Sequence, residues 1–182
     1  MTRQAVLVVD LQKDYLPEGR MALEGVHEAV ANAARVIADA REKGIPVFHM
    51  WHEAPEADAG FFLPGSEGTQ IIPQVTPQEG EQVLRKHYPN SFRETGLLDL
   101  LRAEGIEAIT MVGAMSHICI AATGRAATDF GFDVTTIHDA CATRALEFDG
   151  VTVPAAQVHA ANMAALDFAY GKAIATADYL SD

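Results

Sequence analysis

Short apolar runs alternate along the chain with longer segments in which apolar residues recur every three or four positions. The first run, Ala5–Val9, is continuous, rich in branched side chains and ends at Asp10, which predicts a strand buried on both faces. From Val26 the apolar residues return with a helical period as far as Ala40, and Gly44 follows as a stop signal. The chain therefore opens with a buried strand and an amphipathic helix.

The same alternation continues to the C-terminus. It predicts further strands at 45–51, 81–86, 108–113, 133–138 and 172–176, and further helices at 95–104, at 118–130 and after Pro154. The predicted buried faces of the last two helices are Ile118, Ala122, Ala126 and Phe130, and Val158, Ala161, Ala165 and Phe168. We expect one α/β domain over residues 1–182, a three-layer Rossmann-like sandwich with a six-stranded, mostly parallel sheet and helices on both faces.

Composition narrows the class of partner. The formal charge of −12, from 25 acidic and 13 basic residues, argues against nucleic acid or an anionic membrane as a partner and leaves a small-molecule substrate. No apolar run reaches the ~20 residues that cross a bilayer. Without an export pattern, Cys119 and Cys141 are expected to be reduced, and we expect a cytoplasmic protein.

Three reactive side chains follow the predicted strands. Asp10 ends the first strand, Lys86 ends the third, and Cys119 follows the fourth. Ligands of open α/β sheets bind outside the carboxyl ends of the strands, so these groups are expected to converge. Cys119 also begins a predicted helix, where the helix dipole and Lys86 are expected to lower the pKa of its thiol. The alternative for Cys119 alone is a small buried apolar residue.

Three motifs then resemble one family. They are Val-Val-Asp10-Leu-Gln-Lys-Asp14, Arg85-Lys86-His-Tyr-Pro-Asn-Ser-Phe92 and Val112-Gly-Ala-Met-Ser-His-Ile-Cys119, in this order along nearly the whole chain. The sequence resembles the isochorismatase-like cysteine hydrolases, which include nicotinamidases, N-carbamoylsarcosine amidase and streptothricin hydrolase. The resemblance implies that Asp10, Lys86 and Cys119 are catalytic. It also implies a cis Ala114–Met115 peptide, with the N–H groups of Met115 and Cys119 holding an oxyanion.

The sequence departs from nicotinamidases at their metal site. Those proteins carry Asp-x-His after the second strand and a further histidine in the following loop, where this chain has Met50-Trp51-His52 and Phe61. A single His52 is too few ligands, so we expect no metal and no cofactor, and interpret His52 as a pocket or solvent-facing histidine.

Weaker candidates surround the predicted triad. Tyr15, Trp51, Phe62 and Tyr88 are candidate substrate-binding walls, although each is also a plausible packing residue. His117 is another weak candidate, since two residues of separation gives poor geometry for a bond to Cys119. Cys141 is expected to be a buried structural thiol.

These observations favour a cysteine hydrolase that cleaves the C–N bond of a small amide, lactam or carbamoyl compound through an acyl-enzyme. Two alternatives remain open: a vinyl-ether hydrolase acting on isochorismate, and a non-catalytic partner module. The unpatterned segment 52–80 is expected to be a loop, and its Phe61, Phe62, Leu63, Ile71 and Ile72 predict a contact with a second copy in a homodimer or homotetramer.

Overall fold

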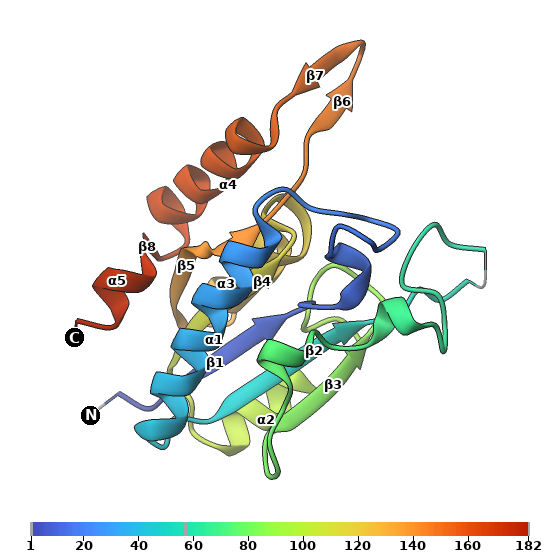
Figure 1. Ribbon diagram of the computed structural model, residues 1–182. Coiled ribbons are helices and arrows are strands. Elements are labelled where there is room, and N and C mark those ends of the chain that lie inside the picture. Colours follow the sequence, from blue (N-terminus) through green and yellow to red (C-terminus); the bar gives the residue numbers. More distant parts are fainter. Residues whose placement is uncertain (1, 57, 182) are drawn as a thin grey trace.

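A six-stranded sheet forms the centre of the computed structural model, which describes residues 2–56 and 58–181 (Figure 1). Residues 1 and 182 of the predicted domain and residue 57 of the predicted loop lie outside the described residues. The strands are β1 (Gln4–Val9), β2 (Val47–His52), β3 (Gln82–Lys86), β4 (Ala108–Ala114), β5 (Asp133–Ala142) and β8 (Lys172–Ile174). Their order is β3-β2-β1-β4-β5-β8, and all pairings are parallel. The predicted fold class is confirmed.

Helices cover both faces of this sheet and divide the core in two. On one face α1 (Val26–Glu42) packs against β1 side chains such as Val6 and Val8, and α5 (Thr176–Tyr179) lies beside α1. On the other face α2 (Leu97–Ala103), α3 (Ala121–Asp129) and α4 (Ala155–Ala169) pack against Ala5, Leu7 and Val9. Because successive residues of a strand point to opposite faces, the continuous apolar run of β1 supplies both cores.

The helical faces could be predicted for α1 but not for α3 and α4. Every apolar position expected in α1 is buried. In α3 the buried residues are Ala121, Thr123, Gly124 and Ala127, whereas Ile118 and Phe130 are exposed. In α4 Leu166 and Met163 are buried, and Phe168 is 92% exposed. Both helices are rich in alanine on all sides, so apolar periodicity carried little information about which side packs.

The apolar side chains of the loop between β2 and β3 differ from the prediction. The segment itself is a loop, as expected, with 3₁₀ turns at Glu67–Thr69 and Pro73–Val75. Its Phe62 and Ile72 are buried in the chain's own core, and Phe61 and Ile71 pack partly against it. The reason given for a subunit contact there was therefore wrong.

The second difference is a hairpin that the sequence pattern did not predict. Strands β6 (Leu146–Phe148) and β7 (Val151–Val153) pair antiparallel and project away from the sheet beyond α4 (Figure 1). Phe148 is 83% exposed and Val151 is 62% exposed. Among the described residues, no helix has the length and apolar character needed to cross a membrane.

Candidate active site

Strands β1, β3 and β4 place Asp10, Lys86 and Cys119 at one edge of the sheet, with β2 between β3 and β1. Asp10 follows β1 with a φ of 53°, a left-handed conformation that aspartate tolerates better than most residues. Lys86 ends β3, and Cys119 lies in a π-helical turn, Ser116–Ile120, between β4 and α3. Gly113 in β4 has a φ of 136°, and any side chain there would collide with the carbonyl of Val9. This close approach of β4 to β1 sets the Cys119 turn beside Asp10.

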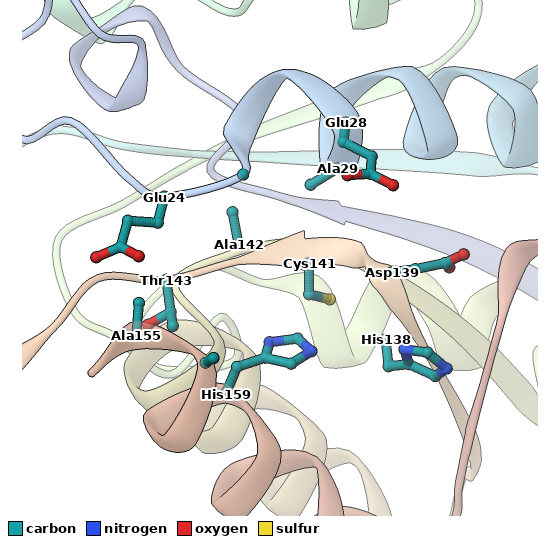
Figure 2. Close-up of a pocket in the computed structure, with 12 residues that line it drawn as sticks. Glu24, Glu28, Ala29, His138, Asp139, Cys141, Ala142, Thr143, Ala155 and His159 are labelled. Atoms are coloured by element: carbon teal, nitrogen blue, oxygen red, sulfur yellow. The ribbon is translucent and has the colours of Figure 1, made fainter. Parts of the chain in front are cut away.

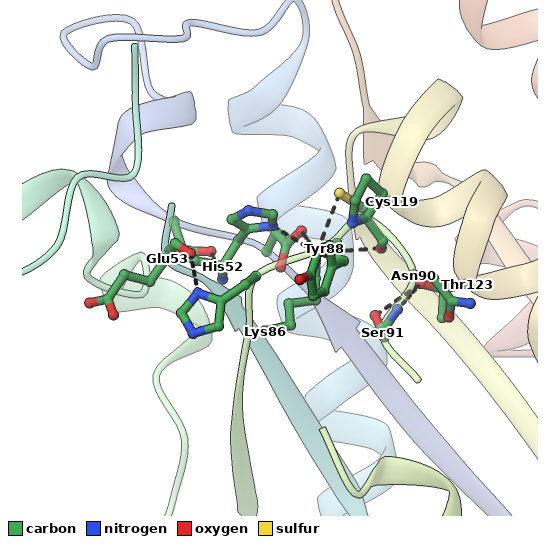
Figure 3. A network of polar contacts seen from close by, with 12 residues as sticks. His52, Glu53, Lys86, Tyr88, Asn90, Ser91, Cys119 and Thr123 are labelled. Carbon is green, nitrogen blue, oxygen red and sulfur yellow. Dashed lines mark hydrogen bonds and ion pairs between the residues drawn. The ribbon is translucent and has the colours of Figure 1, made fainter. Parts of the chain in front are cut away.

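The ammonium of Lys86 contacts both other groups, and Figure 3 shows it beside Cys119 and His52. Its Nζ lies 2.7 Å from Asp10 Oδ2 and donates to Cys119 Sγ at 3.4 Å. It also donates to the carbonyls of Tyr88 at 3.0 Å and Pro89 at 3.4 Å. Asp10 is 0% exposed, Lys86 1% and Cys119 4%, so the three groups interact almost without solvent screening.

The segment after β3 is tied to the Cys119 side of the site. The Ser91 N–H donates to Thr123 Oγ1 at 3.1 Å, and that hydroxyl donates to Ser91 Oγ at 2.9 Å. Thr123 belongs to α3, directly after the Cys119 turn. These bonds hold the turn that carries the Tyr88 and Pro89 carbonyls, and through them the end of Lys86.

Burial controls the electrostatics of the group. It raises the pKa of Asp10, although Lys86 opposes the shift, so Asp10 is a stronger base than an exposed carboxylate. Burial and then the Asp10 charge raise the pKa of Cys119 to about 12. The expected lowering of the pKa of this thiol was therefore wrong, because the thiol is buried and its desolvation exceeds the stabilisation from Lys86. The pKa of Lys86 is raised, because Asp10 and Cys119 outweigh the lowering by burial.

One group of described residues has donor atoms close enough to hold a metal ion. It consists of Asp10, His52 and Cys119, whose ligand atoms lie within 4.8 Å of one another. The Lys86 ammonium lies among them, 2.7 Å from the carboxylate, 3.1 Å from His52 Nδ1 and 3.4 Å from the sulfur. A side-chain cation thus fills the position that a metal would need.

Comparison with known proteins decides the family. The protein-family sequence model described as the isochorismatase domain matches residues 4–177. The chain belongs to the isochorismatase family. An isochorismatase family protein of Bacillus subtilis, YddQ, is 43% identical over 97% of this chain and 98% of its own length. A crystal structure described as an isochorismatase hydrolase from Oleispira antarctica superposes with a TM-score of 0.96 and 45% identity, covering 100% of this chain and 97% of that one.

Relatives in the isochorismatase family include named hydrolases. Streptothricin hydrolase of Streptomyces noursei is 35% identical over 77% of this chain and 50% of its own length. Maleamate amidohydrolase of Pseudomonas putida is 28% identical over 97% of this chain and 84% of its own length. This protein is thus an isochorismatase-family hydrolase. The peptide bond Ala114–Met115 is cis, as the resemblance implied.

The structure brings two of the weaker candidates of this isochorismatase-family chain to the triad. Phe62 is buried and stacks on the His52 ring at a centroid distance of 5.7 Å. Tyr15 packs edge-on against Phe62 at 4.8 Å. The pKa of Tyr15 is raised well above its usual value by burial and then by the charges of Cys119 and Asp10, which indicates that its phenol lies near them.

Three other candidates turn away from it. Trp51 precedes His52 in β2, so its side chain points to the opposite face of the sheet. The Tyr88 ring stacks under the guanidinium of Arg93 at 3.5 Å, and only its carbonyl reaches Lys86. His117 Nδ1 bonds to Thr143 Oγ1 at 2.6 Å, at the end of β5.

Two buried residues of the first motif were missed as contributors to the site. The Gln12 side chain bonds to both main-chain groups of His52, and Asp14 Oδ2 accepts the Phe62 N–H at 2.6 Å. Their spacing in Asp10-Leu-Gln-Lys-Asp14 was the available signal, since alternate polar residues directly after a buried strand are unusual.

The second thiol lies in a different place. Cys141 is a buried residue of β5 and lines a pocket with His138, His159 and Thr143 (Figure 2). Burial raises its pKa to about 12, and the contacts of its pocket do not include Asp10 or Lys86. This position agrees with the expectation of a structural thiol.

Proposed function

We propose that this protein is a cysteine hydrolase that cleaves the C–N bond of a small amide, lactam or carbamoyl compound. The observation that carries the proposal is the buried Lys86 ammonium, which contacts the Asp10 carboxylate at 2.7 Å and the Cys119 sulfur at 3.4 Å. A base, a fixed cation and a thiol in mutual contact are what a cysteine hydrolase needs. The amidohydrolase among its relatives supports an amide-like substrate.

In the proposed mechanism Asp10 takes the thiol proton while Cys119 Sγ attacks the carbonyl carbon. The raised pKa of Asp10 suits it for this step, because the thiol is protonated at neutral pH. The N–H groups of Met115 and Cys119 would hold the oxyanion. Protonated Asp10 then gives its proton to the departing nitrogen, and an acyl-enzyme thioester remains.

The second half of the cycle reverses the roles. Asp10 takes a proton from water, the hydroxide oxygen attacks the thioester carbonyl, and the acid leaves while the proton returns to Cys119. Lys86 stays protonated throughout and balances the single negative charge, which lies on Asp10 in the resting state and on the oxyanion of the tetrahedral intermediates. No cofactor enters this cycle.

The test is a screen of purified protein against small amides, lactams and carbamoyl compounds, with release of ammonia, amine or acid as the readout. For the substrate found, Cys119→Ala and Asp10→Asn should each lower kcat/KM by at least about 10³-fold, while Cys141→Ala should leave it unchanged. Hydrolysis of isochorismate that survives Cys119→Ala would instead support a vinyl-ether hydrolase. An inert thiol with no substrate would support a non-catalytic partner module.

We also propose that the protein forms a homodimer or homotetramer. Phe148 of the projecting hairpin and Phe168 of α4 are 83% and 92% exposed, and a two-stranded hairpin is marginally stable without further contacts. Light scattering should give a mass above the 19.5 kDa of one chain. In the variant Phe148→Ser the mass should fall; a wild-type mass of one chain would refute the proposal.

A further inference from the structure

His52 is the third side chain that contacts the Lys86 ammonium. Its Nδ1 lies 3.1 Å from Lys86 Nζ. The two residues are direct partners in the parallel pairing of β2 and β3, so the register of the sheet places them side by side. An ammonium has three protons, and five acceptors surround this one: the side chains of Asp10, Cys119 and His52, and the carbonyls of Tyr88 and Pro89.

The chemistry of this contact fixes the state of the imidazole. An ammonium only donates, so His52 Nδ1 must accept and its proton must lie on Nε2. Burial, then the charges of Lys86 and His87, lower the pKa of His52 to about 3. The ring is therefore neutral wherever the protein is folded near neutral pH, and it orients the ammonium without competing with Asp10 for a proton.

His52 is held at its main chain and at its ring. Gln12 is fully buried; its Oε1 accepts the main-chain N–H of His52 at 2.7 Å and its Nε2 donates to the His52 carbonyl at 2.8 Å. Phe62 stacks on the ring, and its own N–H is bound by Asp14. His52 is half-buried, so its contact with Lys86 agrees with the interpretation of a pocket histidine, and it adds a defined partner for the ring.

We propose that His52 is a positioning residue that holds the Lys86 ammonium between Asp10 and Cys119. Without it, the ammonium loses one of its three side-chain acceptors and shifts further towards the Tyr88 and Pro89 carbonyls, which it already contacts, and away from the sulfur. The role in turnover rests on the proposed cysteine hydrolase function, whereas the contact itself does not.

The test compares two variants by a readout that needs no substrate. His52→Asn keeps an acceptor oxygen near the position of Nδ1, and His52→Leu removes it at similar volume. We measure the second-order rate at which iodoacetamide alkylates Cys119, on a Cys141→Ala background, from pH 6 to 10. His52→Leu should lower the rate at pH 7.5 by about tenfold, which corresponds to one unit in the difference between the pKa values of Cys119 and Asp10. His52→Asn should stay within about threefold of the parent protein.

A double-mutant cycle shows whether the effect passes through Lys86. In a Lys86→Met background, His52→Leu and His52→Asn should alkylate at equal rates, because there is no ammonium left to position. Equal rates for the two His52 variants in the parent background would overturn the proposal, as would an effect of the same size with and without Lys86.

Nitrogen NMR of the histidine rings provides a test that holds even if Lys86→Met does not fold. The parent protein should show His52 as the Nε2–H tautomer, without titration between pH 5 and 8. A His52 ring that titrates near the usual pKa of about 6.5, or that carries its proton on Nδ1, would refute the contact. If the parent protein shows the Nε2–H tautomer of His52 but hydrolyses none of the amides, lactams or carbamoyl compounds, the proposed function would be wrong and the His52–Lys86 contact would still stand.

Discussion

Replacing Asp10 by asparagine should change how the reactivity of Cys119 depends on pH. In the native protein, passing a proton from Cys119 to Asp10 alters no net charge, so the fraction of reactive thiolate should be independent of pH over the range in which the pair holds one proton. In Asp10→Asn this internal base is gone, and the thiol must lose its proton to solvent.

The size of the effect follows from the distances. The carboxylate and the sulfur lie within 4.8 Å, where two unit charges repel by at least about 3.5 kcal/mol at an effective dielectric constant of about 20. Removing that repulsion should lower the pKa of Cys119 by about 2.5 units or more. Starting from a pKa of about 12, the thiol of the variant should titrate below about 9.5.

The assay is the rate of iodoacetamide alkylation at Cys119 from pH 5 to 10, read by mass spectrometry, with Cys119→Ser as the control. The native protein should give a flat profile, and Asp10→Asn should give a rate that rises about tenfold per pH unit up to its lowered pKa. Amide hydrolysis should be lost in the same variant. A flat profile for Asp10→Asn, or an apparent thiol pKa that remains near 12, would refute the reasoning.

Three further predictions follow from the same structure. Brief treatment of the native protein with sub-stoichiometric iodoacetamide should label Cys119 before Cys141, because the pocket of Cys141 contains neither Asp10, the proposed base, nor Lys86; mass spectrometry showing the reverse order would contradict the assignment. Dialysis against a chelator should leave hydrolysis unchanged, since the Lys86 ammonium lies among the possible metal donors, and activity restored by added zinc would overturn this. Arg41→Met should lower the free energy of unfolding by about 2 kcal/mol at pH 7, because Arg41 binds Glu81 through two bonds of 2.7 and 2.9 Å. Although burial opposes it, Arg41 lowers the pKa of Glu81, so this loss should shrink as the pH falls through the lowered pKa; urea denaturation at pH 7 and pH 3 checks it.

The fold could be predicted wherever apolar spacing depends on one buried face. Strand β1 and helix α1 meet that condition, and both appear at the expected residues. Alanine on every side of α4 leaves its orientation to tertiary packing, so Phe168 was assigned to the wrong face. The β6–β7 hairpin has only three residues in each strand, too few for a periodic pattern to be recognised.

The site could be predicted only as a set of residues. Motifs at three strand ends identified Asp10, Lys86 and Cys119, because the carboxyl ends of parallel strands meet at one edge. The His52 contact depends on strand register, which fixes His52 opposite Lys86 and which a sequence does not state. The signal available was positional: both residues end adjacent predicted strands.

The sequence analysis predicted the wrong protonation state for Cys119. The reason for that error also explains the protonation states of Asp10 and Cys119 in the resting site. A thiol beside a lysine at the start of a helix was expected to be acidic, yet burial acts on Asp10 and Cys119 together and raises the pKa of both. The ammonium lies 2.7 Å from the carboxylate and 3.4 Å from the sulfur, so the one negative charge is more stable on Asp10. The resting state is therefore a carboxylate–ammonium pair beside a neutral thiol. Such a thiol becomes a nucleophile when Asp10 takes its proton, so its reactivity towards a carbonyl or an alkylating agent depends on that internal proton transfer.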